Sequence, residues 1–424
     1  MSTNHAWVSY LDPPYALALC LALLCAASAN AAAPPTTFTG DTMGTRYTIK
    51  VVDLPGDAAR QTVEDEIRQE LQQIDGLMST YRPDSELSNF NRFDRTGEWF
   101  DVSPQTAAVL EEALTVGRLT DGAFDVTVGP LVNLWNFGPD VAVPQKVPTP
   151  EQIESAAARV GFENVEVRTD PPAVRKKLPG LTIDLSGVAK GFAVDRVAEY
   201  LAGRGAENFL VEIGGEVRAA GHNHRGVSWR IGVESPVVGI RAVEKTVALK
   251  NLAMATSGDY RNYFEADGVR YSHIIDPRTG RPVTHRLASV TVLDASCTRA
   301  DALATALMVL GPQEGYELAV REKLAVLMIV RTVTGSNDDG FVEKTTPAFD
   351  KAVPPPPAPA TGRTALTYLA AGVVFLLVFL AMAISVIRRK HCLGCSCKAA
   401  DRIMRGDKPS DTDTCARDEL IRLE

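Results

Sequence analysis

The chain has 424 residues, of which 45% are hydrophobic and 23% charged, a composition typical of folded proteins. Its formal net charge of −8 argues against general nucleic-acid binding, and the 10 tyrosines and 4 tryptophans are too few to favour a base-stacking surface. The length allows two or three domains, or one large domain with accessory segments.

An apolar segment near the N-terminus has the features of an export signal. Tyr15 to Ala27 has the length of a signal-peptide hydrophobic region, and Ala27-Ser28-Ala29 offers a small-residue cleavage site. The residues before it contain no Lys or Arg, so a buried N-terminal helix is the alternative. We expect residues 1–33 to form a signal peptide or an N-terminal membrane segment.

The central region is predicted to mix strands and helices. Alternating apolar residues predict strands, and apolar residues three and four apart predict helices. Because the two kinds follow one another without a regular βαβ rhythm, the pattern favours an α+β fold with antiparallel sheets. The predicted strands lie at 38–52, 181–185, 209–213, 229–233, 289–293 and 325–330; the predicted helices are capped by Asp57, Ser103 and Thr149 or begin at Lys190 and Arg299, the last ending at Gly311.

The stretch from Leu181 to Asp195 combines a predicted strand, a glycine turn and the start of a helix. Ser186 and Gly187 interrupt the alternation, and helical spacing begins at Lys190. Backbone amides and one lysine at such a turn can face an anion. The glycine spacing matches neither a Walker loop nor a dinucleotide-binding fingerprint, so the stretch by itself favours a structural turn over a catalytic one.

Two further segments carry candidate chemistry. Asp301 and Thr305 are four residues apart on one predicted helix, so their oxygen ligands share a face and could bind Mg²⁺. His273 precedes a turn at Asp276-Pro277, where an exposed histidine could act as a general base near pH 7. Taken singly, such an Asp–Thr pair is seldom a metal site, and a lone histidine is usually structural.

Eight motifs in fixed order point to one family: MGTRY, STYRPDSELSNFN, TDGAFDVTVGPLVNLW, DLSGVAKGFAVD, IGGEV, SGDY, HIIDPRTGRP and TRADALATAL. Together they resemble the ApbE family, the FAD:protein FMN transferases, from about Gly40 to about Val330. The order and number of the motifs make the resemblance specific. It implies a T-fold-like α+β domain, in agreement with the predicted elements, and we expect this domain to span residues 34–346.

The resemblance implies a Mg²⁺-dependent transfer of FMN from FAD to a threonine hydroxyl of an acceptor flavoprotein, with release of AMP. The implied metal ligands are the Asp301 carboxylate, the Thr305 hydroxyl and the backbone carbonyl of Gly187. His273 is the residue that we expect to take the threonine proton. The implied contacts to the flavin nucleotide are Met43, Tyr81, Ala123, Phe124, Asp125, Asp184, Lys190 and Ile275.

Two other functions are compatible with these residues. An FAD pyrophosphatase would use water in place of threonine and would release FMN and AMP. A non-catalytic flavin-binding carrier would only hold the nucleotide; the Asp301–Thr305 pair argues against it, because binding alone needs no metal between the phosphates. Without the family motifs, Tyr81 and Phe124-Asp125 would be interpreted as loop packing.

The C-terminal region is predicted to cross a membrane once. A proline-rich linker at 347–363 precedes an uncharged segment, Ala365 to Ile387, that is long enough to span a bilayer. Arg388-Arg389-Lys390 follows at once, and the positive-inside rule places it in the cytoplasm. We therefore expect one transmembrane helix at 364–390 in the bacterial inner membrane, with the transferase domain in the periplasm and the tail, 391–424, in the cytoplasm.

The tail contains four cysteines, Cys392, Cys395, Cys397 and Cys415. In a reducing compartment they favour a metal or iron site over disulfides, with palmitoylated or incidental cysteines as the alternative. The span and tail resemble NqrM, a small membrane protein needed for maturation of the Na⁺-translocating NADH:quinone reductase. This second resemblance implies that the tail aids assembly of that complex and that its subunits are the proteins that receive FMN.

Overall fold

The computed structural model describes residues 33–54, 60–139, 146–236, 243–260, 262–332, 340–353 and 379–381. The chain divides into two compact units, residues 1–354 and 355–424. Apart from residues 33 and 379–381, the expected signal segment, membrane span and cysteine-rich tail lie outside the described residues. Within the described residues, no helix has the length and apolarity needed to cross a membrane.

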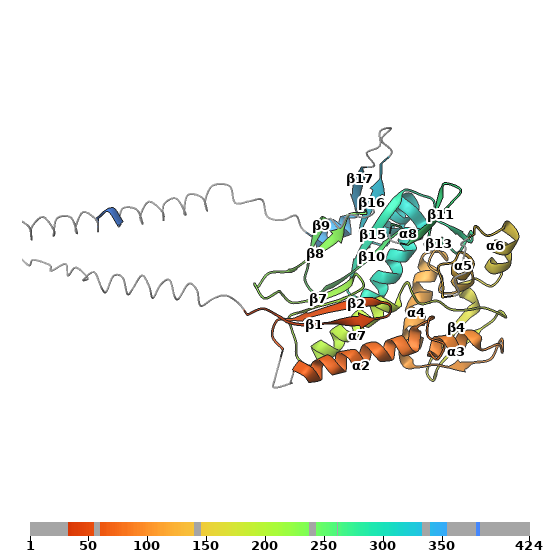
Figure 1. The fold of residues 1–424 in the computed structure, drawn as a ribbon, viewed down its shortest axis with the longest axis horizontal. Helices are drawn as coiled ribbons and strands as arrows, with labels where there is room; N and C mark the ends of the chain where they lie inside the picture. Colours follow the sequence, from red (N-terminus) through yellow and green to blue (C-terminus); the bar gives the residue numbers. More distant parts are fainter. Residues whose placement is uncertain are drawn as a thin grey trace, which may run out of the picture. The chain divides into compact units, whose positions relative to one another are not determined.

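An eight-stranded sheet forms the centre of the described part of the first unit, and all neighbouring strands in it are antiparallel. The antiparallel α+β architecture predicted from the sequence is therefore confirmed (Figure 1). In order across the sheet, the strands are β1 (Thr36–Thr42), β2 (Thr45–Val51), β6 (Phe209–Ile213), β7 (Glu216–Ala220), β10 (Leu252–Gly258), β15 (Leu287–Asp294), β16 (Ala325–Arg331) and β17 (Phe341–Thr345).

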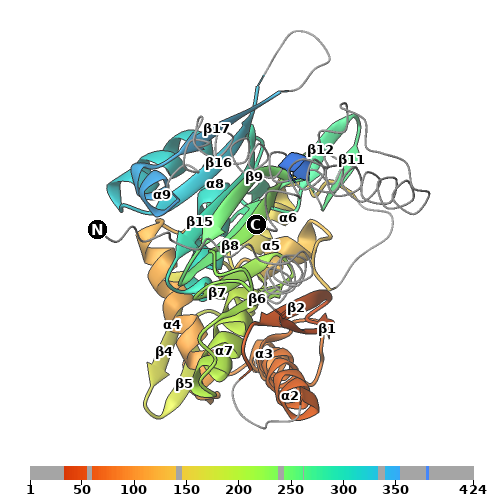
Figure 2. The ribbon, with the colours of Figure 1, turned by 90° about the vertical axis from the view of Figure 1, so that its left-hand side faces the viewer.

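The sheet separates two apolar cores, because successive side chains of a strand point to opposite faces. On β16, Val326 and Met328 belong to one core, whereas Leu327 and Ile329 belong to the other. The first core is completed by α2 (Arg60–Met78), α4 (Pro104–Leu119), α7 (Ala189–Gly203) and α8 (Cys297–Arg321), as Figures 1 and 2 show from two directions. The second is covered by β8 (Trp229–Glu234), β9 (Val243–Leu249) and α9 (Pro347–Ala352).

A third, smaller core lies beside this sandwich and is centred on Trp135. Its indole N–H donates to the carbonyl of Gly280 at 2.9 Å, and its ring stacks on Tyr271. The elements around this core are α5 (Gly129–Leu134), α6 (Pro150–Ala157), β11 (Tyr263–Ala266), β12 (Val269–Ser272), β13 (Ile275–Asp276) and β14 (Arg281–Pro282). The other described elements are α3 (Glu86–Arg92), the short helix Phe162–Asn164, and the three-stranded sheet of β3 (Phe100–Asp101), β5 (Pro172–Lys176) and β4 (Val165–Thr169).

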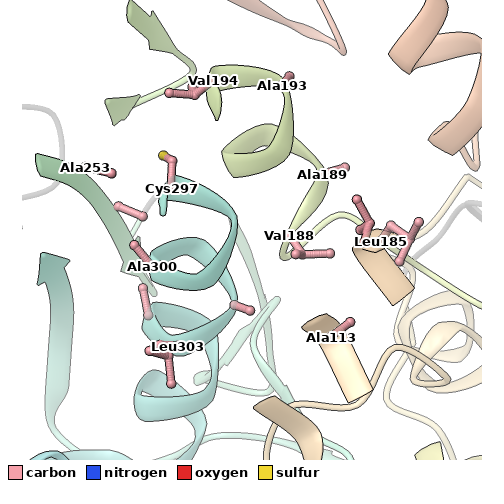
Figure 3. Close-up of a cluster of buried hydrophobic side chains, with 14 of the residues drawn as sticks. Ala113, Leu185, Val188, Ala189, Ala193, Val194, Ala253, Cys297, Ala300 and Leu303 are labelled. Carbon is pink, nitrogen blue, oxygen red and sulfur yellow. The ribbon is translucent and has the colours of Figure 1, made fainter. Parts of the chain in front are cut away.

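Helices α7 and α8 pack side by side through small side chains (Figure 3). A Cβ on Gly191 would lie 2.3 Å from the carbonyl oxygen of Cys297, so glycine is required at this crossing. One turn further along α7, Asp195 accepts the backbone N–H groups of Cys297 at 3.0 Å and Thr298 at 2.9 Å. These N–H groups belong to the first turn of α8, where the helix itself offers no acceptors. The two contacts fix the register of the helices.

The predicted strand at 181–185 is wrong. The side chains of Leu181, Ile183 and Leu185 are buried as the alternation indicates, but the segment pairs with no other strand among the described residues. The side chain of Asn91 takes the place of a neighbouring strand: its amide donates to the carbonyl of Ile183 at 2.8 Å and accepts that residue's N–H at 2.7 Å.

One boundary agrees with the sequence-based prediction and one differs from it. The backbone of Gly311 is non-helical, with a φ of 81°, so the helix that begins at Cys297 is interrupted there as predicted, and a second helical segment within α8 continues from Pro312 to Arg321. Helix α9 occupies part of the expected linker, and its Phe349 is 1% exposed in the second core. The compact unit therefore extends to Pro354.

Candidate active site

One large cavity, with a volume of about 940 Å³, brings the polar motifs together. Its walls come from the β1–β2 turn, the loop after α4, the N-terminal end of α7, the β6–β7 turn, the end of β10 and the first half of α8. The predicted site residues that line it are Ala123, Phe124, Asp125, Asp184, Gly187, Lys190, His273, Ile275, Asp301 and Thr305.

Two predicted nucleotide contacts, Met43 and Tyr81, do not line the cavity. Met43 occupies the β1–β2 turn with a positive φ of 47° and packs against the first core, next to Gly44, which does line the cavity. Tyr81 is 69% exposed. Partial desolvation of the phenol and then the negative charge of Asp184 raise the pKa of Tyr81.

The turn that precedes α7 is held by backbone contacts. Besides the Asn91 pairing, the N–H of Asp184 donates to the carbonyl of Val126 at 2.7 Å. The Asp184 carboxylate in turn accepts the N–H of Ser186 at 2.8 Å, which shapes the turn before Gly187. The turn is thus fixed to the loop after α4 as well as to the end of α3.

Lys190 stands between two buried carboxyl groups. Its Nζ lies 3.5 Å from Oε1 of Glu216 and 3.9 Å from Oδ2 of Asp301. Burial by itself lowers the pKa of Lys190, but the carboxylates of Asp301 and Glu216 outweigh it and raise that pKa, so the amine stays charged. Burial also raises the pKa of both acids, and that of Glu216 reaches about 8.

Asp301 and Thr305 lie on the face of α8 that meets the Gly187 turn. Asp301 is 3% exposed, and its Oδ2 accepts the backbone N–H of Gly191 at 3.0 Å. A Cβ added to Gly187 would lie 3.3 Å from Oγ1 of Thr305, so the main chain of the turn runs beside that hydroxyl.

These three residues fit the predicted ion. Carboxylate, hydroxyl and carbonyl oxygens are hard ligands, and Mg²⁺ combines few such ligands with water and substrate phosphate. Within the part of the chain that the structure describes, no group of three or more His, Cys, Asp or Glu side chains could hold a metal. An ion in this cavity would therefore rely on the Asp301 carboxylate together with the Thr305 hydroxyl and main-chain carbonyls.

His273 has the tautomer and protonation state that a general base needs. Its Nδ1 lies 2.9 Å from the carbonyl oxygen of Asn262, which can only accept, so Nδ1 carries the proton and Nε2 keeps its lone pair. Burial lowers the pKa of His273, which keeps the ring neutral at pH 7.

Asp125 shapes the wall of the cavity. Its carboxylate accepts the N–H of Thr127 at 2.7 Å, the hydroxyl of Thr127 at 2.6 Å and the N–H of Phe162 at 2.9 Å. Phe124, which is 5% exposed, reaches the Gly187 turn, where an added Cβ would lie 3.1 Å from its ring. The carboxylate of Asp125 is therefore engaged within the fold, and the loop that it stabilises is what faces the cavity.

Two polar residues that line the cavity, Glu216 and Ser257, were not predicted, and neither was Asn91, which pairs with the backbone of the turn before α7. The hydroxyl of Ser257 lies 3.2 Å from that of Thr305, and Glu216 contacts Lys190. All three belong to motifs visible in the sequence, but which member of a motif faces the cavity depends on pairings that sequence spacing does not reveal.

Comparisons with known proteins agree with this geometry. Residues 43–328 match the sequence model of the ApbE family. A FAD:protein FMN transferase from Vibrio cholerae is 51% identical over 310 residues, which cover 73% of this chain and 90% of the relative. Another, from Haemophilus influenzae, is 46% identical over 316 residues, covering 74% of this chain and 90% of the relative.

Solved structures show the same fold. The flavin transferase ApbE from Vibrio cholerae superposes with a TM-score of 0.68 at 49% identity, covering 74% of this chain and 98% of that one. The apo form of the Pseudomonas stutzeri flavinyl transferase ApbE superposes with a TM-score of 0.68 at 41% identity, and the match covers 75% of this chain and 96% of that one. Fold and site thus define a flavin transferase. The chain belongs to the ApbE family, and its activity is that of a FAD:protein FMN transferase.

Proposed function

We propose that the protein transfers FMN from FAD to a threonine hydroxyl of acceptor flavoproteins, in a Mg²⁺-dependent reaction that releases AMP. The observation that carries the proposal is the convergence of Lys190, His273, Asp301 and Thr305 on one cavity of about 940 Å³. That volume is within the range of cavities that bind cofactors. Family membership supports FAD as the substrate.

In the proposed reaction, the threonine oxygen attacks the FMN phosphorus and forms a P–O bond, while the bond from that phosphorus to the AMP oxygen breaks. His273 takes the threonine proton at Nε2, which the contact of Nδ1 with Asn262 leaves free. The ring is positioned by that contact before any substrate arrives.

Charge stabilisation is the other requirement, because phosphoryl transfer depends on positioning and on neutralising the phosphate oxygens. The Lys190 ammonium, held charged by Glu216 and Asp301, would contact the pyrophosphate. Mg²⁺ held by Asp301, Thr305 and the carbonyl of Gly187 would supply further neutralisation of the phosphate oxygens.

The proposed location and the proposed acceptor proteins rest on the sequence of segments that lie, apart from residues 379–381, outside the described residues. The apolar segments at 15–27 and 365–387, with the basic residues at 388–390, support a periplasmic transferase domain tethered to the inner membrane. The resemblance of the tail to NqrM supports subunits of the Na⁺-translocating NADH:quinone reductase as acceptors, and iron as the metal of Cys392, Cys395, Cys397 and Cys415.

One assay separates transfer from the two alternative functions. The full-length protein is incubated with FAD, Mg²⁺ and a purified reductase subunit, and flavin is followed on a denaturing gel and in solution. Fluorescence that stays with the subunit supports transfer. Free FMN without a labelled subunit indicates a pyrophosphatase, and unchanged FAD indicates a carrier. A subunit in which valine replaces the acceptor threonine is the matched control and should stay unlabelled.

A further inference from the structure

The cavity extends past the β6–β7 turn to strand β8, where none of the predicted FAD or metal contacts lies. Four consecutive residues of β8, 231–234, line it. Successive side chains of a strand point to opposite faces, so a cavity that meets four residues in a row runs along the edge of the strand. Gly232 is exposed, and Ile231 and Glu234 are half-buried. The edge of β8 is therefore accessible from the cavity.

This edge of β8 is not used for strand pairing by any described strand. β8 pairs with β9, from Trp229 opposite Leu249 to Glu234 opposite Val243, and with no other strand of the described residues. No residue of β9 lines the cavity, so the cavity meets the edge that β9 leaves open. Every second residue of a paired strand turns its N–H and C=O away from the partner. The open edge thus presents backbone groups to which a further strand can be added.

The face of β2 and β6 next to this edge is also open. Tyr47 of β2 and Ile213 of β6 point into the first core. Their neighbours Arg46 and Glu212 therefore point to the opposite face, and both line the cavity. The side chain of Arg46 is 84% exposed, so the β8–β9 layer does not cover this part of the sheet. We call the space between the edge of β8 and this face the β8 groove.

The position of the β8 groove suits the second substrate of the reaction. A FAD:protein FMN transferase brings FAD and a protein to one cavity. Predicted contacts to FAD and metal such as Phe124, Lys190 and Asp301 come from the loop after α4 and from α7 and α8, on the first-core side of the sheet. The β8 groove lies across the β6–β7 turn from them. Along 231–234 it has room for about 13 Å of extended chain, at the rise of a strand.

We propose that the β8 groove binds the acceptor protein, by adding an extended segment of that protein as a strand to the edge of β8. The inference rests on the proposed transfer to a threonine and names how the acceptor is held. Pairing along 231–234 would lead the segment past the β6–β7 turn into the cavity that His273 and Asp301 line. Backbone pairing would hold the segment in one register, and the cavity would select the threonine.

Thr48→Tyr fills the β8 groove in the full-length protein. Thr48 lies opposite Glu212 and shares its face of the sheet, but it does not line the cavity. We expect the KM for the purified reductase subunit to rise at least about 10-fold, because backbone hydrogen bonds to the acceptor are lost. The affinity for FAD, measured by flavin fluorescence with EDTA present, should not change.

Val342→Tyr is the matched control. Val342 is 54% exposed on β17, at the far edge of the same sheet. A tyrosine there adds a similar side chain to a strand of this sheet without entering the β8 groove. Both the KM for the subunit and the affinity for FAD should keep their wild-type values.

Backbone pairing is tested on the acceptor. A rhodamine-labelled peptide of about ten residues, the upper length of a strand, is taken from around the acceptor threonine, with valine at that position. Its binding to the full-length wild type with FAD and EDTA is measured by fluorescence anisotropy. N-methylation of one backbone nitrogen at a time should weaken binding about 2- to 10-fold at alternate residues and have little effect at those between them. Such alternation is specific to strand addition.

An unchanged KM for the subunit in Thr48→Tyr would overturn the proposal, as would a peptide that does not bind or whose N-methylation has no alternating effect. A loss of FAD affinity in Thr48→Tyr would assign the groove to FAD instead. A wild-type dimer in gel filtration that becomes a monomer in this variant would assign the edge of β8 to a second copy of the chain. Peptide binding does not depend on transfer, so alternation without labelling of the subunit would refute the transfer proposal and leave the docking site intact.

Discussion

The carboxylate of Asp301 accepts the backbone N–H of Gly191 at 3.0 Å, although the two residues lie on different helices. This contact joins the predicted metal ligand on α8 to the first turn of α7, which carries Lys190. The geometry of the site therefore depends on how closely these two helices approach each other.

Gly191→Ala tests that dependence. The new Cβ would lie 2.3 Å from the carbonyl oxygen of Cys297 and 2.8 Å from Cβ of Asp301, so α7 has to move away from α8. We expect the free energy of unfolding to fall by about 1–3 kcal/mol, as for other overpacked cores, and transfer to fall with it. Gly203→Ala on the same helix meets nothing within 4 Å and should be neutral or stabilising in urea unfolding. Equal stability of the two variants would contradict the packing argument.

Asp195→Asn tests the contact at the start of α8. The carboxylate also accepts from the Arg218 guanidinium at 2.7 Å, and an amide cannot accept from all of its present donors. We expect a loss of about 1–3 kcal/mol in the free energy of unfolding, because charged hydrogen bonds are broken. Glu199→Gln removes an exposed ion pair with Arg196 and should cost less than about 1 kcal/mol. A cost for Asp195→Asn no larger than this control would exclude the capping role.

The sequence pattern correctly predicted strands that pair with other strands and helices that pack on the sheet. The strands predicted at β2, β6 and β15 and the caps predicted at Ser103 and Thr149 depend on local chemistry, and the structure confirms them. A strand was wrongly predicted at 181–185, because the backbone of this segment pairs with the side chain of Asn91, 92 residues away in sequence, and not with another strand.

The sequence also predicted the site only in part. The motifs identified most cavity residues, but they did not distinguish Asp125, whose carboxylate is engaged within its loop, from Lys190, which faces the cavity. Glu216 was not predicted because it is brought to the site by its contact with Lys190, which joins β7 to α7. Periodicity contains no information about such contacts.

Asn91→Ala should loosen the turn before α7. The substitution removes both hydrogen bonds to the Ile183 backbone and leaves its buried N–H and carbonyl unsatisfied. We expect a loss of about 2–4 kcal/mol in stability and faster amide hydrogen exchange at Ile183. Asn89→Ala removes exposed contacts on the same helix and is the control. Unchanged exchange at Ile183 in Asn91→Ala would show that other contacts hold the segment.

The pH dependence of transfer should report His273. Only the neutral ring accepts a proton, so the rate falls as the pH drops through the pKa of His273. Burial lowers that pKa, and the acid limb of kcat/KM at saturating Mg²⁺ should therefore have its midpoint below the 6.5 of an ordinary histidine. His273→Gln should reduce transfer about 10²- to 10⁴-fold and remove this limb. An unchanged limb in the variant would assign it to another group.

Acceptor labelling by Asp301→Asn tests directly whether Asp301 binds the metal that transfer requires. The amide keeps the volume of the side chain and an oxygen for the Gly191 N–H, so the variant should fold, which circular dichroism checks. We expect wild type with FAD and Mg²⁺ to yield a fluorescent acceptor band, and EDTA to abolish it. Labelling should fall at least about 10²-fold in Asp301→Asn and be lost completely in Asp301→Ala. Full labelling by either variant would contradict the assignment of Asp301 as the metal ligand that makes transfer possible.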